Sequence, residues 1–108
     1  MYFQLGSTLL DACVLGVLQK GDTYGYSLTQ NIKEIISISD STMYPVLRRL
    51  QKEGLLITYD QPYQGRNRRY YTITNEGKQK HAEYATAWHD YKQKVDRVML
   101  GGGEYEQG

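Results

Sequence analysis

The chain has 108 residues and a formal net charge of +1, because 13 lysines and arginines stand against 12 aspartates and glutamates. This length suits one domain at the small end of those that build their own hydrophobic core, so oligomerisation would help it. A net charge near zero excludes a protein that binds nucleic acid through overall positive charge, and any such site must come from where the cations lie.

The first predicted helix opens at Thr8, which with Asp11 resembles a capping box, and continues to Leu18. Its apolar run is too short to cross a bilayer, and residues 1–5 lack the positive region of a signal peptide. The single cysteine, Cys13, cannot form an intramolecular disulfide and is expected to pack as a small hydrophobe. We therefore expect a cytoplasmic protein without a membrane partner.

This first helix is apolar on nearly all sides, so the domain core can cover only part of it. The face expected in the core consists of Leu10, Cys13, Val14 and Val17. A second apolar face consists of Leu9, Ala12 and Gly16. Either a second subunit or the C-terminal helix of the same chain can cover that second face.

A second helix is predicted from Tyr24 to Ile36, with Asp22 or Thr23 as its cap, after the break at Gly21. Its inward positions are Leu28, Ile32, Ile35 and Ile36. The backbone N–H groups at its start, with the hydroxyls of Tyr24 and Tyr26, suit a phosphate contact. The alternative is that these two tyrosines only pack.

The third helix is predicted to follow Ser39 as N-cap and to end before Gly54, which suits a left-handed position. Its apolar stripe consists of Met43, Val46, Leu47 and Leu50, and its other face carries Ser41, Tyr44, Arg48 and Lys52 with Arg49 at the edge. Pro45 predicts an irregularity near Ser41 or a later start. Hydroxyls, an aromatic ring and cations on one face indicate a recognition helix that reads the major groove; the alternative is an ordinary solvated face.

A β-hairpin is predicted next, with strands over residues 56–61 and 69–74 and a turn over residues 62–68. Alternation points Ile57, Tyr59, Tyr71 and Ile73 toward the helices. The tip carries Arg66, Asn67 and Arg68, which suits phosphate or minor-groove contact, unless it is only a solubilising loop. A helix followed by a basic hairpin is the order of a winged helix-turn-helix.

The last helix is predicted from Asn75 to about Leu100 with Thr74 as N-cap, and Gly101 ends it. Apolar and aromatic residues with alternating spacings of 3 and 4 form a seam for a second subunit: His81, Tyr84, Trp88, Tyr91, Val95 and Val98. We therefore expect a mainly α fold with a small β-hairpin, divided into a winged helix-turn-helix domain over residues 1–74, a dimerisation helix over residues 75–100 and a disordered tail over residues 101–108. The residues predicted at the dimer interface are Leu9, Ala12, Gly16, Trp88, Val95 and Val98.

Catalytic and metal-binding patterns are missing from the sequence. His81 and His89 have no carboxylate or thiol at ligand spacing, and no Ser/His/Asp or phosphate-loop motif occurs. We expect no enzyme, no metal and no cofactor. The alternative to a DNA-binding regulator is a winged-helix module that binds protein without sequence-specific DNA binding, although this would leave the clustered cations unexplained.

Residues 10–15, 22–26, 41–55 and 65–77 resemble the corresponding motifs of the PadR family of winged-helix transcriptional regulators. The resemblance implies a homodimer, joined through the first and last helices, that binds an inverted-repeat operator on double-stranded DNA and represses transcription. It also implies that Pro45 is tolerated within the third helix. The DNA contacts carried over by motif position are Tyr24, Thr42, Tyr44, Arg48, Gly65, Arg66 and Arg68.

A single long last helix is similar to the short subgroup of the family, which includes members that sense multiple drugs. In those members a tryptophan of this helix stacks flat aromatic ligands at the two-fold axis. Trp88 corresponds to that residue, and Tyr84 and Tyr91 would line the same site for a planar aromatic effector. The alternative is that Trp88 only packs at the interface.

Overall fold

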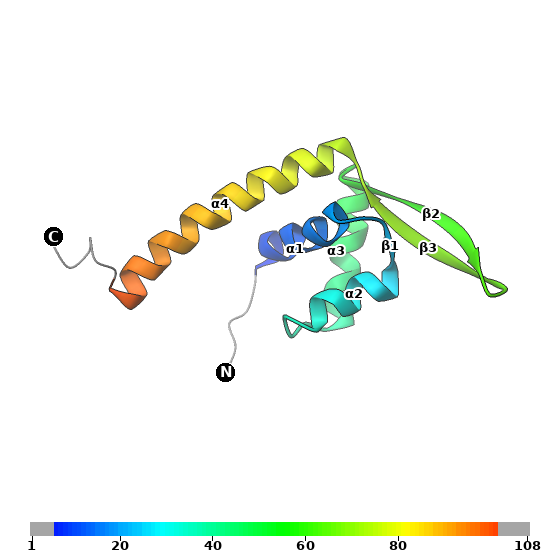
Figure 1. Cartoon of the computed structure of the whole chain (residues 1–108), viewed down its shortest axis with the longest axis horizontal. Helices are drawn as coiled ribbons and strands as arrows, with labels where there is room; N and C mark the ends of the chain where they lie inside the picture. Colours follow the sequence, from blue (N-terminus) through cyan, green and yellow to red (C-terminus); the bar gives the residue numbers. More distant parts are fainter. Residues whose placement is uncertain (1–5, 102–108) are drawn as a thin grey trace.

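The computed structural model of the chain describes residues 6–101 and is mainly helical. In chain order its elements are α1 (Ser7–Gln19), β1 (Thr23–Tyr24), α2 (Gly25–Lys33), α3 (Asp40–Lys52), β2 (Leu56–Tyr63), β3 (Arg66–Ile73) and α4 (Asn75–Leu100). The strands form an antiparallel sheet in the order β1-β3-β2. Figure 1 shows the β2–β3 hairpin extending from one end of the molecule and α4 from the other. This confirms the expected fold class.

The hydrophobic core lies between α1, α2, α3 and the base of the sheet. Its buried members are Leu10, Val14, Leu15, Leu18, Leu28, Ile32, Met43, Val46, Leu47, Leu50 and Leu56. All four residues of the predicted α3 stripe are buried, because the helical period brings them to one face. The prediction for Ile35 was wrong: α2 ends at Lys33, and the Ile35 side chain is 85% exposed.

Two predicted helix starts were also wrong. The N-cap of α1 is Gly6 and makes no side-chain cap, so Thr8 and Asp11 do not form a capping box. The N-cap of α2 is Tyr24, again without a side-chain hydrogen bond, because Thr23 and Tyr24 pair with β3 instead of entering the helix. The short strand β1 is therefore a consequence of tertiary pairing that local propensity does not reveal.

Pro45 lies within α3, which runs without a break from Asp40 to Lys52. The expected irregularity at Ser41 or later start was therefore wrong. Pro45 and Ser41 are both exposed, so solvent can reach the Ser41 carbonyl that lacks its helical N–H partner. Ser39 is the N-cap as predicted, and Gly54 has a left-handed φ of 76° after the helix.

The hairpin is longer and its turn tighter than predicted. Strands β2 and β3 remain paired up to Tyr63 opposite Arg66, so only Gln64 and Gly65 lie in the turn, with φ of 50° and 77°. Two positive φ values are typical of the type I′ turn that joins twisted strands. Arg66 and Arg68 consequently lie on β3 and not in a loop.

The hairpin directs only the expected residues of β3, and not those of β2, toward the core. Leu56 pairs with Ile73, and both contact the core, whereas Ile57 pairs with Thr72 and is 54% exposed. The inward prediction for Tyr71 and Ile73 is confirmed, and that for Ile57 and Tyr59 was wrong. The continued pairing fixes a register in which odd positions of β2 face away from the helices.

Helix α4 begins at Asn75 with Thr74 as its N-cap, as predicted, and the Thr74 hydroxyl accepts a hydrogen bond from the Gly77 N–H at 3.0 Å. It ends at Gly101, which has the left-handed conformation favoured after a helix. Its first half passes over α1, and its second half extends beyond the other elements (Figure 1). No helix within residues 6–101 is long and apolar enough to span a bilayer. The predicted tail lies outside the described residues, apart from Gly101.

Candidate nucleic-acid interface

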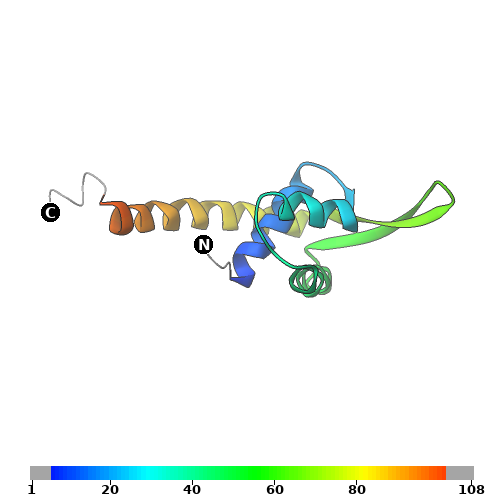
Figure 2. The same cartoon turned by 90° about the horizontal axis from the view of Figure 1, so that it is seen from below.

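The outer face of α3 presents the predicted recognition residues to solvent. Thr42, Tyr44 and Arg48 are exposed, on the side of the helix opposite the buried stripe. In Figure 2 α3 is seen nearly end-on at one edge of the molecule. The hydroxyls of Ser41 and Thr42 both contact that of Ser39, at 2.9 and 3.0 Å. This face combines donors, acceptors, an aromatic ring and a cation on a rigid element.

Arg49, expected at the edge of this face, turns instead toward α1. Its guanidinium donates hydrogen bonds of 2.9 and 2.6 Å to the two carboxylate oxygens of Asp11. The hydrogen bond to Asp11 raises the pKa of Arg49. Including Arg49 in the DNA-facing cations was therefore a wrong expectation, and the acidic Asp11 within an apolar helix was the sequence signal for its partner.

The sheet surface that faces away from the core is covered by aromatic rings. The Tyr59 and Tyr70 rings stack at 5.5 Å between centroids, and Tyr24 lies 5.9 Å from Tyr70 and 6.5 Å from Tyr26. The Tyr59 hydroxyl donates a 2.7 Å hydrogen bond to Asp22, which raises the pKa of Tyr59. These contacts join the start of α2 to the hairpin and so fix Tyr24 beside the wing.

Arg68, on the central strand β3, lies between aromatic rings from the two neighbouring strands. Its guanidinium carbon is 4.0 Å from the ring centroid of Tyr24 on β1 and 3.6 Å from that of Tyr63 on β2. Arg66 lies on the same side of β3 and is exposed, and Gly65 is in the turn. Arg69 faces the other side, 3.6 Å from Asp60.

The base of the wing lies against α3. Burial raises the pKa of Tyr71, nearby Arg69 opposes this, and Tyr44 of α3 adds to the rise. Strand β2 contacts α3, and Leu56 at its start packs in the core with the buried stripe of that helix. The predicted DNA contacts from α2, α3 and the wing consequently belong to one connected set of elements, of which β1 was missed from the sequence.

A hollow of about 350 Å³ lies between α1 and α4 and contains two of the predicted ligand residues. Its lining comprises Leu9, Ala12, Cys13, Ile36, His81, Tyr84, Ala85 and Trp88. A smaller adjoining hollow of about 150 Å³ adds Tyr91, whose ring is 6.4 Å from that of Trp88. The lining is largely apolar and aromatic, and Trp88 remains 43% exposed. Such a surface can receive a flat apolar ring.

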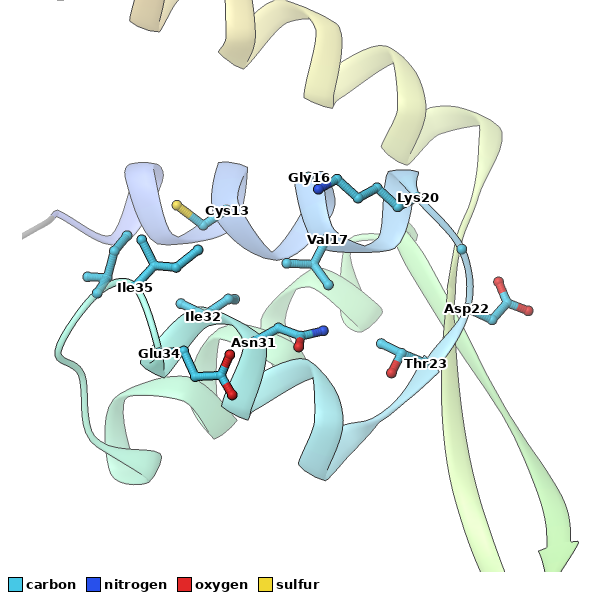
Figure 3. A pocket seen from close by; sticks show the side chains of 12 residues that line it. Cys13, Gly16, Val17, Lys20, Asp22, Thr23, Asn31, Ile32, Glu34 and Ile35 are labelled. Atoms are coloured by element: carbon cyan, nitrogen blue, oxygen red, sulfur yellow. The ribbon is translucent and has the colours of Figure 1, made fainter.

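A larger hollow of about 770 Å³ lies between α1 and α2 (Figure 3). Its apolar floor includes Val17 and Ile32, and its rim carries Lys20, Asp22 and Glu34. Cys13 and Ile36 line both this hollow and the one beside Trp88. This hollow could not be predicted from the sequence, because it depends on the angle between the two helices.

The predicted dimer residues lie along α1 and α4. Leu9 and Ala12 line the Trp88 hollow, whereas a side chain added at Gly16 would meet His81 of the same chain at 3.5 Å. Val95 is half-buried, and Val98 is 75% exposed. The same chain's α4 thus covers part of the second apolar face of α1 and leaves the distal α4 residues uncovered.

Within the part of the chain that the structure describes, no three His, Cys, Asp or Glu side chains come together in an arrangement suited to a metal ion. Burial raises the pKa of Cys13, which lowers the fraction of reactive thiolate at neutral pH.

Residues 14–83 match the sequence model of the transcriptional regulator PadR-like family. The Bacillus subtilis protein called negative transcriptional regulator PadR is 38% identical over 77 residues, which are 66% of this chain and 42% of that protein. The crystal structure of smu.1704 from Streptococcus mutans UA159 is similar at a TM-score of 0.86 and 40% identity, over 94% of this chain and 95% of that one. A PadR family transcription regulator from Clostridium difficile R20291 gives a TM-score of 0.78 at 28% identity, over 83% of this chain and 97% of that one.

Proposed function

This chain belongs to the PadR-like family of transcriptional regulators, and from that premise we propose that it is a repressor that binds an inverted-repeat operator as a homodimer and is released by a small aromatic effector. The observation that carries the proposal is the exposed face of α3 beside a cationic wing. One chain thus has both elements with which a winged helix contacts duplex DNA: a helix that can contact base edges and a hairpin that can contact phosphates.

For DNA binding, we assign base contacts to α3 and phosphate contacts to the wing. Tyr44 and Arg48 are exposed on α3 and can reach base edges in the major groove, with Thr42 near the start of the helix. Arg66 and Arg68 bring positive charge to β3, and Tyr24 stands beside Arg68. Two copies related by a two-fold axis would read half-sites about 34–36 Å apart, or a multiple of that distance.

For the homodimer, the argument comes from the surface that one chain leaves uncovered. The radius of gyration is 16.7 Å, whereas a compact domain of about this length has roughly 13 Å. The excess reflects the extended hairpin at one end of the molecule and the overhanging part of α4 at the other (Figure 1). On α4, Tyr91, Val98 and Leu100 are 62%, 75% and 73% exposed. Apolar side chains on an isolated helical arm favour a second copy as their cover.

For the effector, the support is the aromatic lining of the hollow beside Trp88. A planar ring stacked on Trp88 would contact α1 and α4, the two helices that the proposed dimer shares. A ligand that prefers one spacing of the two recognition helices then changes operator affinity by its differential affinity for the two states of the dimer. By reciprocity, operator must change ligand affinity by the same factor.

The test of this function is binding of the purified protein to duplex DNA from immediately upstream of its own gene, with unrelated DNA as competitor, across a series of salt concentrations. Specific binding that weakens steeply with salt is expected. Absence of binding even at low salt would refute the proposal and favour a protein-interaction module. Sedimentation of the protein alone and with DNA measures the two-fold stoichiometry independently.

A further inference from the structure

We propose that Tyr63 is a positioning residue that holds the guanidinium of Arg68 in place for a DNA phosphate. The inference rests on the proposed DNA-binding function and adds a residue that does not itself need to touch DNA. Tyr63 ends β2 next to the turn, and its ring centroid is 3.6 Å from the guanidinium carbon of Arg68. The Tyr24 ring is on the other neighbouring strand, at 4.0 Å.

Stacking between two rings suits a guanidinium that must also bind an anion. The central carbon of the guanidinium lies over both rings, whereas its N–H donors extend outward from that carbon in the plane of the group. A phosphate can therefore be bound without breaking either ring contact. An ammonium group has no such plane, which makes arginine the better residue at this position.

The sheet supplies the geometry that brings these three side chains together. Tyr24 pairs with Tyr70, which is two residues after Arg68 on β3, and Tyr63 pairs with Arg66, which is two residues before it. The two rings therefore belong to positions on either side of Arg68 along β3. Arg68 is half-buried as a result, whereas Arg66, two residues away on the same side, is exposed. Arg66 makes no cation–π contact with a ring among residues 6–101, whereas Arg68 makes two. Arg66 therefore serves as a control, because it is an arginine on the same strand that is not held between two rings.

Fixing a long side chain before binding removes an entropy cost from the complex. We expect Tyr63→Ala to weaken DNA binding about three- to ten-fold, a range typical of losing one cation–π contact and the order it imposes. Because Arg68 keeps its charge in this variant, the dependence of affinity on salt should stay as in the wild type. Arg68→Ala should instead reduce the salt slope by about 0.9, the value for one phosphate contact.

The experiment is a double-mutant cycle on the full chain, with binding measured by fluorescence anisotropy on the upstream duplex and on a random-sequence duplex. Tyr63→Ala is compared in the wild type, in Arg68→Ala and in Arg66→Ala. Tyr63→Phe keeps the ring and removes only the hydroxyl, so it should bind within about two-fold of the wild type. Circular dichroism of each variant checks that the hairpin and helices remain folded.

The expected result is that Tyr63→Ala costs affinity in the wild type and in Arg66→Ala but has little further effect in Arg68→Ala. An equal loss in all three backgrounds would show that Tyr63 acts without Arg68 and would overturn the inference. So would wild-type affinity for Tyr63→Ala, in which case the proposed DNA binding would still stand. If the wild-type protein bound neither duplex, both proposals would fail together.

Discussion

Arg49 of α3 holds the buried carboxylate of Asp11 on α1 through two side-chain hydrogen bonds, of 2.9 and 2.6 Å. The next residue toward the N-terminus, Arg48, points to solvent on the outer face of the same helix. Successive helical residues point about 100° apart, so two adjacent arginines have different tasks. Arg49 ties α3 to α1, the helix that lines both hollows, and Arg48 is exposed to solvent.

Replacing Arg49 with Ala should destabilise the fold by about 2 kcal/mol. The variant leaves the carboxylate of Asp11, whose side chain is 6% exposed, without its ion-pair partner in the core. This expected loss of stability is smaller than the loss for a fully buried ion pair, because the Arg49 side chain is 38% exposed. Asp11→Asn should cost less, about 1 kcal/mol, since Arg49 can still reach water. Urea unfolding at one protein concentration measures both.

Arg48→Ala is the matched control for that experiment. Its side chain is exposed one position away on the same helix, so its effect on stability should lie within about 0.5 kcal/mol. Equal urea midpoints for Arg48→Ala and Arg49→Ala would contradict a stabilising role for the Asp11 contact.

Gly77→Ala should destabilise the protein by about 3 kcal/mol. A Cβ at this buried position would collide with the backbone carbonyl of Leu55 and lie 2.7 Å from the Ile73 side chain. The Leu55 carbonyl also accepts a 3.2 Å hydrogen bond from the Thr74 N–H, so moving it would disturb the start of α4. Thermal unfolding followed by circular dichroism measures the change.

Gly16→Ala serves as the comparison, since Gly16 is also a helical glycine. Its added Cβ would meet the His81 ring at 3.5 Å, an ordinary contact, and alanine favours the helix by roughly 1 kcal/mol. Unchanged or higher stability is expected. A loss as large as that of Gly77→Ala would mean that α1 and α4 lie closer than the structure has them.

Arg48→Ala and Arg66→Ala should weaken DNA binding in different ways. If Arg48 reads a base, its removal reduces the preference for one sequence by about 1–3 kcal/mol. Arg66→Ala should weaken binding to every sequence and lower the salt slope by about 0.9. Competition binding with operator variants at several salt concentrations separates the two effects, and identical profiles for both variants would refute the division between helix and wing.

Planar cationic aromatic dyes should quench the fluorescence of Trp88, the sole tryptophan of the chain. Trp88→Ala should weaken dye binding about ten-fold, since it removes a stacking surface at the hollow. The loss is measured by the anisotropy of the dye, because the variant has no tryptophan signal. His89→Ala, exposed on the adjacent position of α4, should bind as the wild type does. Absence of quenching by several chemotypes would refute the effector site.

Periodicity in the sequence predicted the helices and the side of α3 that enters the core, because burial of an apolar stripe every three to four residues is a local property. Thr74, Gly54 and Gly101 marked helix ends in the same way, through the needs of unpaired backbone groups. The residues of the α3 outer face therefore followed from the sequence, and the structure presents them to solvent.

Pairing between segments that are far apart in the sequence could not be predicted from these local patterns. Residues 23–24 form β1 because β3 offers them a partner, and the same ladder shortens the turn and directs Ile57 outward. Asp11 and Arg49 are 38 residues apart, and Arg68 meets rings from two other strands. The sequence by itself thus determined the four helices, the presence of the hairpin and the family motifs, since these depend on neighbouring residues. Only the tertiary structure decided which arginine supports the core and which lies between two aromatic rings, because that depends on which groups the fold brings within reach of each side chain.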